Sequence, residues 1–363
     1  MSRFFSHEYS EARAHFLETC KSSRATIRSY RHERVNGQLP VDLVIDTARF
    51  GPTNASRILV LISGTHGVEG FCGSACQIAA VESGSWNPIP ADMSIFLIHG
   101  LNPYGFATLR RVDVENVDLN RNFVEDFEAL AGYNPEYDQL NDALNPTRWR
   151  ETDPQDGDDV IKTFITTEGM KKFQDVVSIG QYRHPGGIFF GGRRKAWSRM
   201  ILEEIVEAEF QNARSVGVID YHTGLGSHGE GELISFAPED SILYKRSVDW
   251  CGPKVKSTKS KAANLAAVAA DVGGAIDGAF LGNDRIVTFL SLEFGTVPIP
   301  AVLRALRAEN WLVKYGESDS ELGKRIKADL RSAFYPTDQS WKDMVLSRSK
   351  EVVAQVIAGL SNT

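Results

Sequence analysis

The stretch RILVLISGTHGVEG, residues 57–70, decides the fold, because it joins a short apolar strand to a glycine-rich turn and the start of a helix. The run from Ile58 to Ile62 is apolar on both faces, which is typical of a strand buried between two layers of helices. Similar β-branched runs recur along the chain, and helix-like stretches lie between them. The expected strands are 42–46, 57–63, 94–99, 216–221, 232–236 and 286–293, and the expected helices are 70–83, 198–214 and 299–313. This pattern predicts an α/β protein with a three-layer α/β/α sandwich.

The two ends of the chain and one long insertion complete the predicted architecture. Residues 6–30 have helix-like spacing and predict a helix packed outside the sheet, and residues 318–359 predict two closing helices separated at Tyr335-Pro336. Residues 125–181 are acidic and broken by proline, which predicts an irregular excursion of the kind that often covers a site. The sequence contains no repeat or linker that marks a second domain, so we expect a single domain over residues 1–363.

Composition and charge exclude several classes of function. The 363 residues are 42% hydrophobic and 24% charged, which is an ordinary globular composition. Lys and Arg number 40 against 47 Asp and Glu, so a net charge of -7 makes nucleic acid an unexpected partner. The four cysteines form no CxxC pair and are expected to be reduced. Because no apolar run reaches the ~20 residues of a membrane helix and no signal-peptide core begins the chain, we expect a cytoplasmic protein without a membrane partner.

The turn after the strand at 57–63 carries His66 and Glu69, spaced as His-x-x-Glu. On a tight turn that opens a helix, an imidazole and a carboxylate at this spacing converge within metal-ligand distance, and the neighbouring glycines let the backbone bend. His222 directly follows the strand at 216–221. Because ligands of open α/β sheets bind at the carboxyl ends of the strands, His222 is expected to meet the other two residues there. Two histidines and one glutamate form a catalytic zinc set, so the sequence predicts one bound Zn²⁺.

Glu293 ends another apolar strand, 286–293, and is expected at the same edge of the sheet. A carboxylate beside the metal would serve as a general base for the attacking water. The residues alone leave structural alternatives open. His66 and His222 would then be buried structural histidines, and Glu293 would cap a helix or pair with an arginine.

Further motifs complete a pattern that resembles the zinc metallocarboxypeptidase family. The segments that match in order and spacing are His66-x-x-Glu69, NPYG at 102–105, Arg111, DLNRNF at 118–123, His222-Thr223 and Glu293. The resemblance spans about residues 57–297. It implies a zinc carboxypeptidase-like catalytic domain around a mixed, mostly parallel sheet.

The resemblance implies roles for the residues around the metal. It assigns the zinc to the His66, Glu69 and His222 set and makes Glu293 the general base. Asp118 would be the partner that orients the His66 ring.

The resemblance also implies a substrate site. Asn120 and Arg121 would hold a substrate's terminal carboxylate, and Arg111 would help to stabilise the oxyanion. Arg111 is preferred to its neighbour Arg110 because of its spacing to Arg121. The alternative for Arg121 is a structural ion pair.

One residue of the family pattern has no counterpart in this sequence. The family's mobile active-site tyrosine is expected upstream of Glu293, but residues 271–281 contain no tyrosine. Either another residue substitutes for it, with Tyr182 as a candidate, or the substrate differs from an ordinary peptide. The sequence favours a zinc-dependent hydrolase that cleaves an amide bond next to a free carboxylate in a small peptide. The first alternative is an N-acyl amino acid deacylase similar to the related aspartoacylase and succinylglutamate desuccinylase. The second alternative is a non-catalytic zinc-binding protein that has kept the fold.

Overall fold

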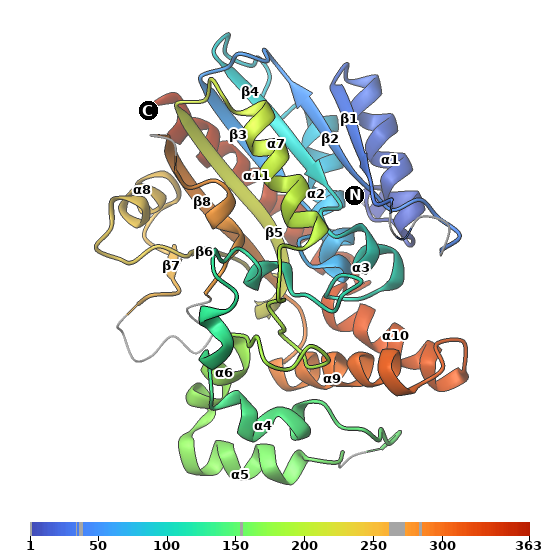
Figure 1. Cartoon of the computed structure of the whole chain (residues 1–363). Coiled ribbons are helices and arrows are strands. Elements are labelled where there is room, and N and C mark those ends of the chain that lie inside the picture. The colour runs from blue at the N-terminus through green and yellow to red at the C-terminus, as the bar shows by residue number, and fades with distance from the viewer. Residues whose placement is uncertain (1, 34, 36–38, 153–154, 261–272, 283–284) are drawn as a thin grey trace.

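An eight-stranded sheet runs through the centre of the protein in this computed structural model (Figure 1). The structure describes residues 2–33, 35, 39–152, 155–260, 273–282 and 285–363. The strands are β1 (Thr26–Arg31), β2 (Val44–Phe50), β3 (Arg57–Ile62), β4 (Met93–His99), β5 (Ser215–His228), β6 (Gly231–Ser235), β7 (Lys256–Ser257) and β8 (Ile286–Gly295). They lie side by side in the order β1-β2-β4-β3-β5-β8-β6-β7.

The sheet is mixed, with parallel strands at its centre. β4, β3, β5 and β8 pair in parallel, and so do β6 and β7. The pairs β1–β2, β2–β4 and β6–β8 are antiparallel. The prediction of a mixed, mostly parallel sheet is therefore confirmed.

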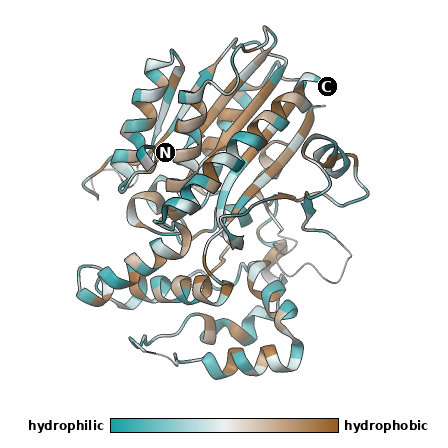
Figure 2. Ribbon diagram, turned by 180° about the vertical axis from the view of Figure 1, so that it is seen from behind, coloured by the Kyte–Doolittle hydropathy of each residue, from teal (hydrophilic) through white to brown (hydrophobic). Residues whose placement is uncertain are grey.

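Helices cover both faces of the sheet. The helices in the described residues are α1 (Tyr9–Ser22), α2 (Gly70–Ser83), α3 (Pro103–Thr108), α4 (Tyr137–Leu144), α5 (Asp158–Glu168), α6 (Met170–Ser178), α7 (Trp197–Glu209), α8 (Ile242–Cys251), α9 (Ile299–Tyr315), α10 (Glu321–Phe334) and α11 (Gln339–Ser361), and those packed on the sheet lie on both of its faces. In Figure 1, α7 lies in front of the sheet, and α2 and α11 lie behind it. Figure 2 shows the same arrangement from behind, with largely hydrophobic central strands between the helices. None of the helices in the described ranges combines the length and apolar character needed to cross a membrane.

β3 explains why the sheet needs a helical layer on each side. Successive side chains of a strand point to opposite faces. Leu59 and Leu61 belong to the core shared with α1, α2 and α11, whereas Ile58, Val60 and Ile62 belong to the core shared with α7. Each of these buried side chains contributes about 1.5–3 kcal/mol relative to an exposed one. The three-layer prediction is confirmed, and the prediction of two closing helices is confirmed by α10 and α11.

The N-terminal helix is shorter than predicted. α1 ends at Ser22, and the rest of the region that was expected to be helical, up to residue 30, contains β1. Arg24 lies between them with a φ of 60°, a left-handed conformation that cannot continue a helix. All side chains of β1 are at least partly exposed, because β1 is the edge strand and only β2 pairs with it. An edge strand without a buried apolar run gives little sequence signal.

The prediction that residues 125–181 are irregular is wrong for much of the segment. It contains α4, α5 and α6, whose apolar faces pack together around Tyr137, Leu140, Ile161 and Phe173. These helices are short, so each contributes only a few apolar positions, and the periodicity in the sequence is weak. In Figure 1 they lie below the sheet, near α9 and α10.

Candidate metal centre

Four of the predicted site residues lie at the carboxyl edge of the sheet. The 3₁₀ helix η2 (Gly67–Glu69) follows β3. His66 directly precedes this helix, and Glu69 is its last residue. His222 lies in β5 opposite Glu293 of β8 in the strand register. Gly67 is required in the turn, because a Cβ atom there would lie 2.0 Å from the carbonyl carbon of Gly105. The glycine therefore lets the His-x-x-Glu turn pack closely on α3.

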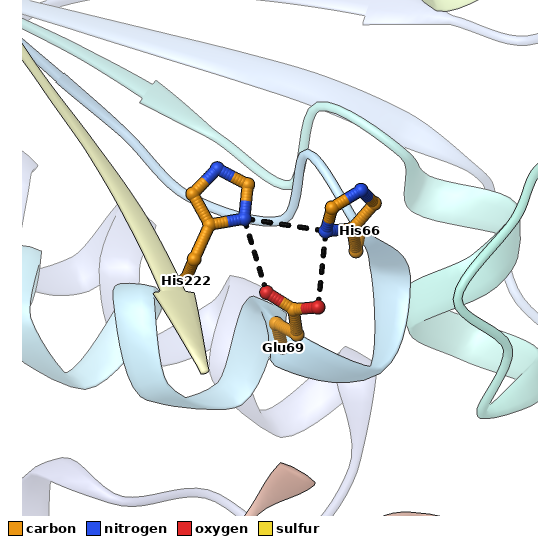
Figure 3. Close-up of side chains that lie close together, drawn as sticks. All are labelled: His66, Glu69 and His222. Atoms are coloured by element: carbon orange, nitrogen blue, oxygen red, sulfur yellow. Dashed lines mark hydrogen bonds and ion pairs between the residues drawn. The ribbon is translucent and has the colours of Figure 1, made fainter. Parts of the chain in front are cut away.

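The side chains of His66, Glu69 and His222 converge on one point and are buried (Figure 3). His66 Nδ1 lies 3.0 Å from Glu69 Oε1, and His222 Nδ1 lies 3.1 Å from Glu69 Oε2. The two Nδ1 atoms are 3.2 Å apart. One ligand atom from each residue lies within 4.8 Å of the others, so the three residues can hold a metal ion.

The outer nitrogen of each histidine is bound to an aspartate. His66 Nε2 lies 3.0 Å from Asp118 Oδ1, and His222 Nε2 lies 2.6 Å from Asp220 Oδ2. Because an ionised carboxylate only accepts hydrogen bonds, each Nε2 atom donates to its aspartate, and loss of the Nδ1 proton would leave a lone pair on each ring that faces Glu69 and the other histidine. In the metal-free site a proton shared with Glu69 separates the facing nitrogens, and a metal ion would take the place of that proton. The donor set therefore fits a metal ion.

The charges of the buried groups support the same conclusion. The site contains two more carboxyl groups than guanidinium groups, namely Glu69, Asp118, Asp220 and Glu293 against Arg111 and Arg121. A divalent cation would balance this excess.

The pKa values follow the contacts of each acid. Burial opposes ionisation of Glu69, but the adjacent His66 and His222 hold the pKa of Glu69 below its usual range. Burial and the nearby Glu69 charge raise the pKa of Glu293 to about 8. Although burial opposes it, the Asp220 carboxylate raises the pKa of His222 well above its ordinary value. Without a cation, protons therefore relieve the excess negative charge.

Glu293 faces a cavity of about 100 Å³ beside the three ligands. Its Oε1 atom accepts a hydrogen bond of 3.0 Å from the backbone N–H of Leu225. No ion pair joins Glu293 to an arginine in the part of the chain that the structure describes, and Glu293 lies in a strand, so neither structural alternative applies. The apolar residues that line the cavity are Phe189, Leu225, Ile234, Phe236, Val302, Leu306 and Phe334.

Arg111 lines the cavity, whereas Arg110 does not. Arg111 donates from Nε to Asp118 Oδ2 at 3.0 Å and from Nη1 to Glu69 Oε1 at 3.0 Å. Its Nη2 atom has no acceptor among the described residues. Arg110 instead forms a buried ion pair of 2.8 Å with Glu309. The geometry therefore agrees with the choice of Arg111.

Asn120 and Arg121 also line the cavity, and hydrogen bonds to neighbouring residues fix both side chains. Arg121 donates from Nη1 to Asp118 Oδ2 at 2.6 Å and from Nη2 to the carbonyl oxygen of Ser178. The structural ion pair considered for Arg121 therefore exists, although the side chain faces the cavity. Asn120 Oδ1 accepts from the backbone N–H of Ile276 at 3.0 Å, which leaves the amide nitrogen without an acceptor among the residues described.

Tyr182 does not replace the missing tyrosine. Its hydroxyl donates to the carbonyl oxygen of Arg121 at 2.6 Å, and its ring packs against Tyr133 and Phe127, away from the cavity wall. It supports the backbone of Arg121. The segment 271–281, where the tyrosine was expected, is described only from Gly273, and residues 271 and 272 lie outside the described residues.

Sequence reasoning missed Asp220 and Thr65. Asp220 precedes His222 by two positions in one strand, so both side chains lie on the same face, and this spacing was a usable signal. Thr65 Oγ1 donates to Asp220 Oδ1 at 2.8 Å. The turn that carries one histidine ligand therefore also positions the partner of the other.

Comparisons with known proteins agree with this fold. A family model described as "Protein of unknown function (DUF2817)" matches residues 5–348, and no curated protein matches the chain. The solved structure of bovine thrombin-activatable fibrinolysis inhibitor in complex with tick carboxypeptidase inhibitor has a TM-score of 0.53 at 10% identity, covering 100% of this chain and 99% of that chain. Carboxypeptidase A from Helicoverpa armigera has a TM-score of 0.45 at 12% identity, covering 92% of this chain and 75% of that chain. The predicted zinc carboxypeptidase-like fold is confirmed.

The contact between Asp220 and His222 predicts a loss of metal affinity on substitution. Asp220→Asn should weaken zinc binding about 10–100-fold, because the neutral amide no longer fixes the His222 ring and its tautomer as strongly. Competition with a chromophoric zinc chelator measures the affinity. Asp113→Asn is the matched control, since this buried side chain accepts only backbone hydrogen bonds outside the site. Equal zinc affinity of Asp220→Asn and the unsubstituted protein would contradict the assignment.

Proposed function

This chain belongs to the family described as "Protein of unknown function (DUF2817)", and we propose that it is a zinc-dependent hydrolase that cleaves an amide bond next to a free carboxylate. One observation carries the proposal. The acceptor atoms of His66, Glu69 and His222 converge beside the carboxyl group of Glu293 in one cavity. A metal-binding set with a neighbouring acid is the arrangement that metal-assisted hydrolysis requires.

His66, Glu69 and His222 would hold the zinc ion. When bound there, zinc supplies a Lewis acid that activates water and polarises a carbonyl group. Asp118 and Asp220 keep the two imidazole rings in the tautomer whose Nδ1 lone pair faces the ion. The Nη2 atom of Arg111, which has no acceptor among the described residues, would donate to the oxygen on which negative charge develops.

Glu293 would transfer the proton. It would accept a proton from the attacking water and donate it to the leaving amine nitrogen, while the Leu225 N–H keeps one carboxyl oxygen in place. Its pKa of about 8 belongs to the metal-free site, where burial and Glu69 disfavour the charged form. A bound cation would favour the carboxylate and lower this pKa, which makes Glu293 a base at neutral pH.

Replacement of this acid gives the first test of the reaction. Glu293→Gln should reduce kcat by at least ~10²-fold, the range of general acid–base assistance, and should keep the fold and the zinc. The glutamine oxygen can still accept from Leu225, so the geometry is preserved. The matched control is Glu232→Gln, because Glu232 lies opposite Glu293 in the strand register but forms an ion pair with Lys256. Turnover of Glu293→Gln within a few-fold of the unsubstituted protein, with zinc bound, would remove Glu293 from the mechanism.

Arg121 and Asn120 would bind the free carboxylate of the substrate. A guanidinium group matches the geometry of a carboxylate and can hold it with two charge-assisted hydrogen bonds. Arg121 is buried and fixed by Asp118 and Ser178, so its position is set before the substrate arrives. Such positioning would fix the scissile amide near the metal.

A double comparison tests the carboxylate site. Arg121→Ala should lower kcat/KM at least ~10²-fold for a substrate with a free carboxylate, because a charge-assisted contact in a partly dry site is lost. Arg121→Lys should restore little of it, since an ammonium group lacks the planar fork. The same substrate with an amidated carboxylate should be poor for the unsubstituted protein and should lose little more in Arg121→Ala. Equal cleavage of the acid and amide forms by the unsubstituted protein would exclude carboxylate anchoring.

A second candidate function uses the same residues of the cavity. An N-acyl amino acid also has an amide next to a free carboxylate, so the same metal residues and Arg121 would serve its deacylation, which is the alternative to cleavage of a small peptide. A panel of dipeptides and N-acyl amino acids separates the two by the preferred substrate. Zinc binding without turnover of any of these compounds would favour a non-catalytic zinc-binding protein.

A further inference from the structure

Phe189 has an unusual backbone conformation at the cavity wall. Its φ is 56°, in the left-handed region, which is a genuine outlier for a bulky residue and suits glycine. Its side chain lines the cavity, and its ring also packs against the core of α4–α6 and the core of α9 and α10. Strain of this kind persists only where the surroundings fix the backbone, and it concentrates at functional sites.

Hydrogen bonds of Phe189 and of the residue before it hold the Phe189 backbone in this conformation. The carbonyl oxygen of Phe189 accepts from the N–H of Gln181 at 3.1 Å. The preceding residue, Ile188, donates its N–H to Asn145 Oδ1 at 2.9 Å and accepts from the hydroxyl of Tyr137 at 2.8 Å. Tyr137 and Asn145 lie at the two ends of α4. The excursion therefore fixes the backbone of a residue in the cavity wall.

A hydrogen bond on the C-terminal side links Phe189 to Asp118. The carbonyl oxygen of Phe190 accepts from the N–H of Asp118 at 2.8 Å. Asp118 Oδ2 in turn accepts from both Arg111 and Arg121. The same short segment therefore positions the Phe189 ring and the carboxylate that binds both guanidinium groups.

The ring of Phe189 contacts both guanidinium groups. The guanidinium carbon of Arg121 lies 4.7 Å from the ring centroid, and that of Arg111 lies 5.3 Å from it. The two cations share one carboxylate oxygen, so they lie close together and repel each other. The face of an aromatic ring is negative and attracts each of them. Hydrogen bonds to Asp118 and contacts with the ring of Phe189 thus hold the two guanidinium groups together.

We propose that Phe189 is a positioning residue that fixes the guanidinium groups of Arg111 and Arg121 and so sets where a substrate carboxylate binds. This inference rests on the proposed function, because it takes these two arginines as the donors to the substrate. The strained backbone is explained by this task. In this conformation the ring, on a segment anchored on α4, contacts two arginines that are anchored on Asp118.

Phe189→Leu is the most direct variant, because leucine keeps an apolar side chain and removes the aromatic face. It should raise KM about 3–30-fold for a substrate with a free carboxylate, the range of cation–π contacts. KM for the amidated form should change less than about twofold, and zinc content should stay the same. Phe210→Leu is the matched control, since the Phe210 ring packs in the core next to α7 and should leave both KM values unchanged. A purely structural role for Phe189 would change both substrates alike.

A second pair of variants tests the strain without any substrate. Phe189→Gly and Phe189→Ala both remove the ring, but only glycine relaxes at a φ of 56°. Phe189→Gly should therefore melt at a higher temperature than Phe189→Ala, while both bind carboxylates weakly. A melting temperature of Phe189→Ala equal to or above that of Phe189→Gly would contradict the strained conformation.

Binding of N-acetylphenylalanine, measured by calorimetry on the zinc-loaded protein, separates the two proposals. If the unsubstituted protein cleaves none of the substrates but Phe189→Leu still weakens binding of this carboxylate, the proposed function fails and the role of Phe189 stands. If the unsubstituted protein cleaves the acid form and Phe189→Leu matches it in KM and in binding, the role of Phe189 is overturned. Absence of carboxylate binding to the unsubstituted protein would overturn it as well.

Discussion

The fully buried carboxylate of Asp118 holds three functional side chains at once. Its Oδ1 atom binds His66 Nε2, and its Oδ2 atom binds the guanidinium groups of Arg111 and Arg121. A buried carboxylate without partners would be costly, but although burial raises the pKa of Asp118, these cations outweigh it and keep the pKa well below its usual range. One side chain therefore links the metal centre to the proposed carboxylate site, and displacement of Asp118 would disturb both.

The fold supplies the frame around this carboxylate. The parallel strands β3, β5 and β8 run toward one edge of the sheet and position the candidate metal-binding residues and Glu293 there. The excursion supplies the other side, because the last residue of α6, Ser178, accepts from Arg121, and α4 fixes the segment that carries Phe189. The sheet thus positions the candidate metal-binding residues, and the segment that contains α4, α5 and α6 completes the cavity wall where a substrate would bind.

The sequence predicts that His66, Glu69 and His222 lie together, and the structure brings them together because their positions follow from regular structure. His66 follows β3, whereas β5 continues past His222 to His228, and parallel pairing with β8 places His222 opposite Glu293. Asp220 was predictable from its spacing to His222, although it was missed. Phe189 and Tyr182 differ, because they lie in a segment whose path depends on contacts with residues distant in sequence. Tyr182 was a candidate for the missing tyrosine, but its hydroxyl binds the backbone of Arg121, and residue type alone does not determine which way a side chain points.

The helices of the excursion and the edge strand β1 show the same limit. Short elements such as α4 bury few side chains each, and β1 buries none fully, so neither gives a strong periodic pattern. Their structure comes from packing against neighbours. The long central strands, with apolar residues on both faces, specify their environment by themselves.

The central claim is that His66, Glu69 and His222 hold one zinc ion through the two Nδ1 atoms. Anomalous diffraction at the zinc absorption edge, from crystals of the zinc-loaded protein, tests it most directly. The account predicts a single peak about 2.0–2.1 Å from Nδ1 of both histidines and about 2.0–2.2 Å from an oxygen of Glu69. A peak bound through Nε2, a peak elsewhere in the protein, or no peak in protein that contains stoichiometric zinc would contradict it.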